Sequence, residues 1–124
     1  MFSEQKTFNS DLNKWDVSQV SNMNETFAKC SKFNSNLNSW DVTSVTSLHG
    51  TFYLNEKFNT ALGSWQTSSV TSMEMTFRNC DVFAQDLDSW QTSEVTTMYG
   101  MFSRATNFNS DLNGWNVANV ENTR

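Results

Sequence analysis

One pattern recurs every 25 residues along the whole chain, with no insertion or deletion between its copies. A fixed period of this length is typical of solenoids, in which each repeat buries its apolar side only against its neighbours. We therefore predict a single solenoid domain over residues 1–124, in which identical phases of successive repeats lie directly over one another. Its five repeats are 2–26, 27–51, 52–76, 77–101 and the truncated 102–124. The positions that carry the period are Phe2, Phe27, Phe52, Phe77 and Phe102; Phe8, Phe33, Phe58, Phe83 and Phe108; Leu12, Leu37, Leu62, Leu87 and Leu112; Trp15, Trp40, Trp65, Trp90 and Trp115; and Val20, Val45, Val70, Val95 and Val120.

Each repeat contains two kinds of local pattern. Trp15 and Val17 flank Asp16, which is the alternation of a strand. Asn22 is a good helix N-cap, and Met23, Phe27 and Cys30 follow at the spacing of one helix face. We therefore predict the α/β class: a right-handed, leucine-rich-repeat-like stack of five strand–turn–short-helix coils with a parallel sheet on one face.

Charge and hydropathy exclude two classes of partner. The net charge of −5 argues against nucleic acid, whose binders concentrate Lys and Arg. No run of 18 apolar residues is present, so we expect no membrane span. Neither end carries an obvious polar capping repeat, since Phe2 already stands in repeat phase. We therefore expect the chain to belong to a longer array, or to pack end to end or within a larger assembly.

Recurrent aromatic and sulfur positions are better explained as core than as a site. The tryptophans share a face with the valine positions, which predicts an internal ladder of indole rings. Cys30 and Cys80 lie in the same phase two coils apart, too far for a disulfide, so we predict two buried reduced thiols. The column of Asn9, Asn34, Asn59 and Asn109 predicts side-chain amides that satisfy backbone groups at a bend.

The recurring motif F-N-x-D-L-x-x-W-D-V-x-x-V-x-x-M, followed by M-F or T-F, resembles a bacterial surface-protein repeat of 25 to 26 residues. That family is known as BspA-like leucine-rich repeats or mycoplasma lipoprotein-type repeats, and similar repeats are abundant in microalgae. The resemblance implies a leucine-rich-repeat-like solenoid, a cell-surface or extracellular location, a role in adhesion or protein interaction, and no catalytic residues. Repeats three and four depart from the motif, since they read W-Q-T in place of W-D-V. The residues that carry it in the first copy are Phe8, Asn9, Asp11, Leu12, Trp15, Asp16, Val17, Val20, Met23 and Phe27.

The alternation predicts a flat polar surface of short side chains on the outer face of the sheet, which is where repeat proteins commonly bind. A solvated face whose side chains bond to one another is the alternative. Asp16 beside Asp41 places like charges on adjacent strands, so a cation or a basic partner is a further hypothesis. The candidate partner-binding residues are Asp16, Asp41, Gln66, Gln91, Asn116, Ser18, Thr43, Ser68 and Ser93.

No catalytic or metal-binding constellation is evident. His49, the single histidine, stands in a variable column and in a different phase from the two cysteines. The carboxylates have neither zinc nor calcium-repeat spacing, so we predict no metal and no cofactor. The short threonine column of Thr46, Thr71 and Thr96 raises ice binding only as a distant alternative, as is an enzyme.

The predicted function is a non-enzymatic repeat module that binds a protein or a glycan, of the surface-protein or adhesin type. The alternative is a structural subunit that packs within a larger multi-protein assembly.

Overall fold

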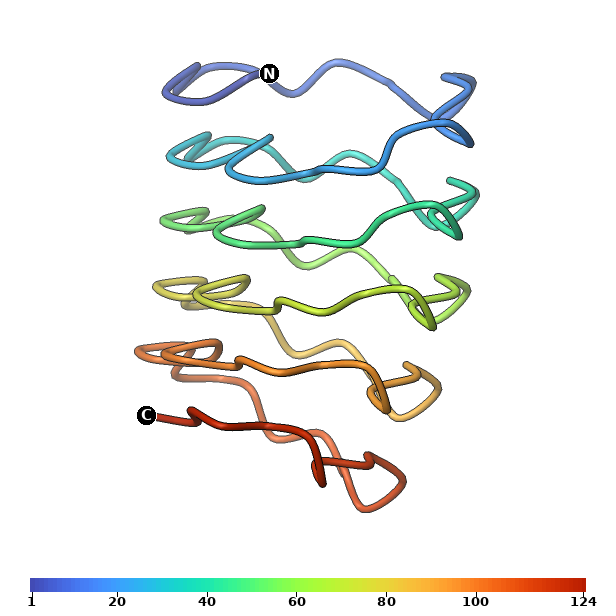
Figure 1. Ribbon diagram of the computed structural model, residues 1–124. Coiled ribbons are helices and arrows are strands. Elements are labelled where there is room, and N and C mark those ends of the chain that lie inside the picture. Colours follow the sequence, from blue (N-terminus) through green and yellow to red (C-terminus); the bar gives the residue numbers. More distant parts are fainter.

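The structure is a computed structural model that describes all residues 1–124, and it winds them into a stack of similar coils (Figure 1). Equivalent residues of successive repeats lie next to one another along the stack. The rings of Phe27 and Phe52 are nearly parallel, with centroids 5.8 Å apart, and the centroids of Phe52 and Phe77 are 5.6 Å apart. Each coil therefore corresponds to one 25-residue period.

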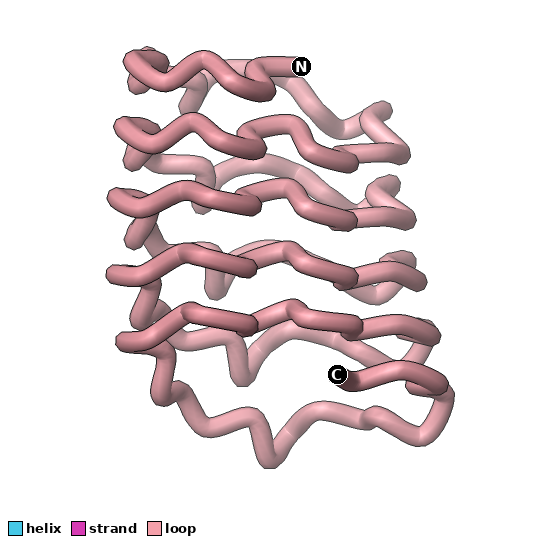
Figure 2. The backbone as a smooth tube through the Cα atoms, turned by 90° about the vertical axis from the view of Figure 1, so that its left-hand side faces the viewer, coloured by secondary structure: helices cyan, strands magenta, loops and turns pink.

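The predicted α/β class is wrong. The chain forms no helix and no strand, and in Figure 2 it is drawn as loop throughout. Neither the strand predicted around Trp15–Val17 nor the helix predicted after Asn22 is present, and the predicted parallel sheet is therefore absent as well. No helix is present that could cross a membrane. Strand-like pairing is limited to isolated parallel bridges, one residue per coil: Asn22 with Ser47, Ser47 with Ser72, Ser72 with Thr97 and Thr97 with Asn122.

Residues 23–30 do not form a helix because their N–H groups go alternately to two kinds of acceptor. Phe27 donates to the carbonyl of Thr51 on the next coil at 2.9 Å, whereas the next N–H, that of Ala28, closes a turn to Glu25 at 3.1 Å. Glu25 and Lys29 have φ angles of 52° and 60°. A right-handed helix needs negative φ and i to i−4 bonds at every residue, so this backbone cannot continue as one.

Residues 15–17 do not form a strand because local turns capture their neighbours' N–H groups. Val20 donates to the carbonyl of Val17 at 2.9 Å, and Trp15 donates to that of Leu12 at 3.0 Å. The Asp16 carboxylate accepts the N–H of Ser18 at 3.0 Å. Side chains of Asp, Asn and Ser that bond to the backbone two residues on compete with strand ladders in this way.

The core follows the periodic columns as predicted. The inner tryptophans Trp40, Trp65 and Trp90 are buried, and the rings of Trp65 and Trp90 stack with centroids 6.0 Å apart. This confirms the internal ladder for the inner coils, whereas Trp15 on the first coil remains 46% exposed. Cys30 and Cys80 are buried free thiols, as predicted, and burial raises the pKa of Cys80 to about 12.

Two long walls of the stack differ in how they join neighbouring coils. We call residues 21–29 and their equivalents 46–54, 71–79 and 96–104 the backbone-bonded wall. All backbone–backbone hydrogen bonds between coils belong to this wall and to the chain ends that continue it, and its segments run side by side in Figure 2. We call residues 9–20 and their equivalents 34–45, 59–70, 84–95 and 109–120 the side-chain-bonded wall. There, coils are joined by side chains.

Candidate functional site

The predicted binding residues all lie on the side-chain-bonded wall. Most are exposed, as an outward position requires, whereas Ser18 and Gln91 are half-buried. Their exposed members are Asp16, Asp41, Gln66, Asn116, Thr43, Ser68 and Ser93.

The two aspartates of this set are engaged in local structure. Asp16 Oδ1 accepts both the N–H of Ser18 at 3.0 Å and its hydroxyl at 2.7 Å. Asp41 Oδ1 accepts the corresponding groups of Thr43 at 3.0 and 2.6 Å. These bonds favour the charged form, so the pKa of each carboxyl is lowered, chiefly by the side-chain hydroxyl. Each carboxylate therefore stabilises a turn of its own coil.

The glutamine–threonine variant of the motif is also structural. Thr67 is buried in the position of the motif valine, and its N–H donates to Gln91 Oε1 on the next coil at 2.9 Å. Gln91 N–H in turn donates to Thr67 Oγ1 at 2.9 Å. Thr92 Oγ1 donates to the carbonyl of Asn116 at 3.0 Å and so joins the last two coils. The departure from W-D-V thus replaces a local aspartate turn by a bond between coils.

The remaining polar side chains of this wall form ladders along the stack. Asn9 Oδ1 accepts the N–H of Asn34 at 2.7 Å, and Asn34 Oδ1 accepts that of Asn59 at 2.8 Å. The prediction that these amides satisfy backbone groups is therefore confirmed for Asn9, Asn34 and Asn59, except that each bond reaches the next coil instead of staying within its own bend. The indole N–H of Trp65 donates to the carbonyl of Leu37 at 2.8 Å, and Trp40 and Trp90 make the equivalent bond. Polar residues and tryptophan recur at these positions because their side chains form the hydrogen bonds between neighbouring coils.

The backbone-bonded wall places a weaker requirement on its outward side chains. Threonine hydroxyls such as that of Thr71 add bonds between its coils, but main-chain groups join every pair of neighbouring coils there. Most outward side chains can therefore change from one repeat to the next while the coils stay bonded. Residue types at these positions do differ from one repeat to the next. The variable columns of the wall read Asn24, His49, Glu74, Tyr99 and Arg124; Ala28, which is buried, followed by Tyr53, Arg78 and Ser103; and Lys29, Leu54, Asn79 and Arg104.

Large side chains gather at the third to fifth coils of this wall. We call them the Tyr–Arg patch, and neighbouring coils bring them together. The N–H of Leu54 donates to the carbonyl of Arg78, and the N–H of Met75 donates to that of Tyr99, both at 2.9 Å. Arg78 Nη1 lies 3.8 Å from Met75 Sδ. The patch consists of Tyr53, Leu54, Met75, Arg78, Tyr99 and Arg104, of which Tyr99 and Arg104 are exposed and the others half-buried.

Both arginines of the patch have no carboxylate partner. The acidic side chains that have a basic partner are Glu4, whose carboxylate pairs with Lys29 at 2.6 Å, and Glu74, which lies 3.8 Å from His49 Nδ1. The guanidinium groups of Arg78 and Arg104 are thus unneutralised in a protein whose net charge is −5. Tyr, Met and Arg are enriched in the interfaces of protein complexes, and unpaired guanidinium groups suit carboxylates.

Other reactive groups are not brought together. His49 lies beside Glu74 on the backbone-bonded wall, while the two thiols are buried in the core. No three His, Cys, Asp or Glu side chains form a group that could hold a metal ion. In the threonine column, Thr71 Oγ1 donates to the carbonyl of Thr46 on the preceding coil at 3.1 Å. That hydroxyl therefore helps to join the coils.

Sequence reasoning missed the Tyr–Arg patch because it placed a helix there and looked for function on regular columns. A signal was present in the composition. Gly50 and Gly100 occupy one phase, and both have left-handed backbone, with φ of 58° and 60°. Glycine at a fixed phase favours left-handed residues over a helix.

The comparisons with known proteins identify a family without a known activity. The family model "Mycoplasma protein of unknown function, DUF285" matches residues 1–64 and again residues 37–124. No curated protein and no solved structure matches the chain. The match agrees with the expected mycoplasma-type repeat and leaves the BspA-like and leucine-rich-repeat descriptions unconfirmed. Since the two matches together span every residue, the chain belongs to the DUF285 family of Mycoplasma proteins.

Proposed function

We propose that this chain is a non-enzymatic repeat module that binds a protein partner through the Tyr–Arg patch. The observation that supports this most is the division of labour between the walls. Regular polar columns join the coils on one wall, while the other displays a different combination of side chains on each coil. Such a surface can distinguish one partner from another.

The chemistry of the patch supports a partner segment that carries a carboxylate next to an apolar or aromatic side chain. Arg78 and Arg104 provide guanidinium groups that no acidic residue of the chain neutralises. Tyr53, Leu54 and Met75 supply apolar surface beside them. Tyrosine and arginine are the residue types that most often dominate binding energy at interfaces.

Binding of peptides from a displayed random library would test this proposal. Peptides selected on the 124-residue chain should carry an acidic residue near an aromatic one, and the double variant Arg78→Ala/Tyr99→Ala should bind them at least about tenfold more weakly. The control is Asp16→Asn/Asp41→Asn on the opposite wall, which should leave the affinity unchanged. Loss of binding in the control with retention in the patch variant would contradict the proposal. Selective binding of sugars on a glycan array, with no peptide selected, would favour a glycan partner instead.

A further inference from the structure

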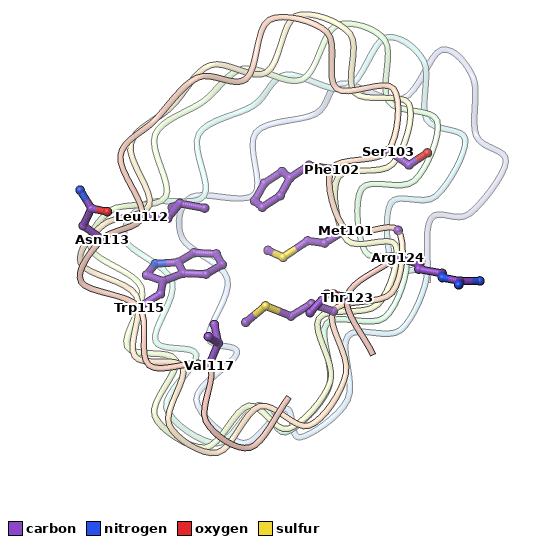
Figure 3. A pocket seen from close by; sticks show the side chains of 11 residues that line it. Met101, Phe102, Ser103, Leu112, Asn113, Trp115, Val117, Thr123 and Arg124 are labelled. Atoms are coloured by element: carbon purple, nitrogen blue, oxygen red, sulfur yellow. The ribbon is translucent and has the colours of Figure 1, made fainter. Parts of the chain in front are cut away.

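Arg78 carries a half-buried guanidinium group that no carboxylate neutralises. Its Nε is buried and has no hydrogen-bond partner, and its Nη1 lies 3.8 Å from Met75 Sδ, which is a weak acceptor. The phase of Arg78 faces outward: in Figure 3, which is seen along the stack, Ser103 at the same phase points away from the core and Phe102 points into it. Because a partly desolvated charge attracts an opposite charge more strongly than a solvated one, Arg78 is suited to pair with a carboxylate of another molecule.

Two apolar residues flank Arg78 along the backbone-bonded wall. Met75 belongs to the same turn, in which the N–H of Arg78 donates to the carbonyl of Met75 at 3.2 Å. Leu54 belongs to the preceding coil, and its N–H donates to the carbonyl of Arg78 at 2.9 Å. Both side chains are half-buried. The unneutralised charge therefore has an apolar neighbour on its own coil and another on the coil before it.

The backbone at both flanking residues is left-handed, with φ of 57° at Leu54 and 53° at Met75. A β-carbon disfavours this conformation, whereas glycine adopts it freely and asparagine tolerates it. The neighbouring coils carry these favoured residues at the same phases, Asn79 after Leu54 and Gly50 before Met75. Among all residues with left-handed backbone, only these two are apolar, since the others are glycine, asparagine or charged residues.

A role in the core explains the two apolar side chains less well than a role in binding. The core residues beside them, Phe52 and Phe77, are fully buried, whereas Leu54 and Met75 stay partly exposed. Strained positions cluster at sites of function, where a residue is kept although stability disfavours it. The strain at these two positions therefore points to a contact that lies outside the chain.

We propose that Arg78 binds a carboxylate of the protein partner, and that Leu54 and Met75 select an apolar side chain next to that carboxylate. This inference rests on the proposed function and identifies the centre of the Tyr–Arg patch. The matching partner segment has an aspartate or a glutamate with large apolar residues on either side. Arg104 contributes less to affinity, because water and salt screen a fully exposed charge.

NMR titration of the isotope-labelled 124-residue chain with the peptide acetyl-Phe-Asp-Leu-amide would test this proposal. The Nε–H resonance of Arg78 should shift with this peptide and should not shift with acetyl-Phe-Asn-Leu-amide, which has nearly the same shape without the charge. Arg78→Gln should weaken binding of the acidic peptide at least about tenfold, and Arg104→Gln about twofold.

The pattern of shifts separates this inference from the proposed function. Shifts confined to Tyr99 and Arg104 would overturn the assignment of Arg78 and leave peptide binding by the patch intact. The absence of any shift on the patch would also overturn the assignment. If, in addition, no peptide were selected from the displayed library, the proposed function would be overturned with it.

The neighbouring coils supply substitutions that separate binding from stability. Leu54→Asn introduces the residue type of Asn79, and Met75→Gly that of Gly50. Each should weaken binding of the acidic peptide about fivefold, while the urea midpoint of unfolding stays the same or rises because the backbone strain is relieved. Glu25→Gly, at the phase of Met75 but away from the patch, should likewise keep or raise the midpoint without weakening binding. Unchanged affinity in the two patch variants would overturn the proposal, and a lower midpoint with it would show that these side chains serve the fold.

Discussion

On the backbone-bonded wall a coil binds its neighbour through main-chain N–H and C=O groups, whereas on the side-chain-bonded wall Asn, Ser and Trp side chains perform the same task. Phe52 N–H donates to the carbonyl of Thr76, while Asn59 N–H donates to the side-chain oxygen of Asn34. The first kind of bond is independent of residue type and the second is not. Regular polar columns on this protein therefore mark structure, and irregular columns mark the surface that is free to acquire a function.

The largest expected change in the free energy of unfolding comes from replacing Trp65 on the side-chain-bonded wall. Trp65→Phe removes the indole N–H that donates to Leu37 and reduces the volume of a fully buried side chain. We expect the free energy of unfolding to fall by about 2 kcal/mol, measured by urea denaturation, from the lost hydrogen bond and imperfect repacking. Tyr99→Phe on the other wall removes a hydroxyl that makes no hydrogen bond, so it should change the free energy of unfolding by less than about 0.5 kcal/mol. Equal losses in the two variants would remove the distinction between the walls.

Left-handed residues distinguish the backbone-bonded wall from a helix, and the next prediction concerns them. Gly100→Ala adds a methyl group that meets only atoms at 3.8 Å, but its φ is 60°. We therefore expect the free energy of unfolding, measured by heat or urea, to fall by about 1 kcal/mol, entirely because alanine disfavours the left-handed backbone conformation.

Two variants control the prediction for Gly100. Glu25→Gly, at the same phase with φ of 52°, should stabilise by about 0.5 kcal/mol. Gly63→Ala has ordinary contacts at 3.9 Å and no left-handed backbone, so it should not destabilise. A helix over this segment would instead make Gly100→Ala stabilising.

A missing rung of the asparagine ladder offers a gain in stability. The N–H of Ala84 donates to Asn59 Oδ1 at 2.9 Å, but Ala84 has no side-chain oxygen that could accept the N–H of Asn109, which makes no such bond. Ala84→Asn should restore the rung and raise the free energy of unfolding by about 0.5 to 1 kcal/mol. Ala84→Leu, which lacks the oxygen, should not. An equal gain from both substitutions would show that the added volume is responsible.

The smallest effect is the dependence of stability on acid. The pKa values of Asp16 and Asp41 are lowered in the folded protein by the hydroxyls of Ser18 and Thr43. Their contribution is therefore present above the ordinary pKa of aspartate and is lost as pH falls through the lower folded pKa. Asp16→Asn/Asp41→Asn keeps the accepting oxygens without the charge, so unfolding followed from about pH 6 to pH 2 should show a weaker pH dependence. An unchanged pH profile would contradict the assigned role of these carboxylates.

The sequence was sufficient to predict the period, the in-register stacking and the inward columns, because burial at fixed phases depends only on periodicity. It was not sufficient for secondary structure. Met23, Phe27 and Cys30 are all buried, but the spacing that predicted a helix face also arises where alternate N–H groups leave for the next coil. Apolar periodicity records which side chains point inward and does not record where the N–H groups bond.

The candidate site shows the same limit. The outward position of Asp16 and Asp41 followed from alternation, but their engagement with Ser18 and Thr43 required the turn geometry. The Tyr–Arg patch could not be predicted as a regular column, because its six members are spread over four phases of the repeat and the residue type at each phase changes from coil to coil. Asn55 is a further example: it stands in the cysteine column, where its Nδ2 donates to Phe27 and its buried Oδ1 has no partner.

The most direct test of the two-wall account is NMR detection of couplings across hydrogen bonds, which identifies the acceptor of each N–H. The account predicts that the amide of Phe52 couples to the backbone carbonyl of Thr76, and that the amide of Asn59 couples to the side-chain carbonyl of Asn34. Coupling of the Phe52 amide to the carbonyl of Leu48, four residues earlier, would instead indicate an α-helix in this segment. Coupling of Asn59 to a backbone carbonyl of the neighbouring coil would make the two walls alike and contradict the account.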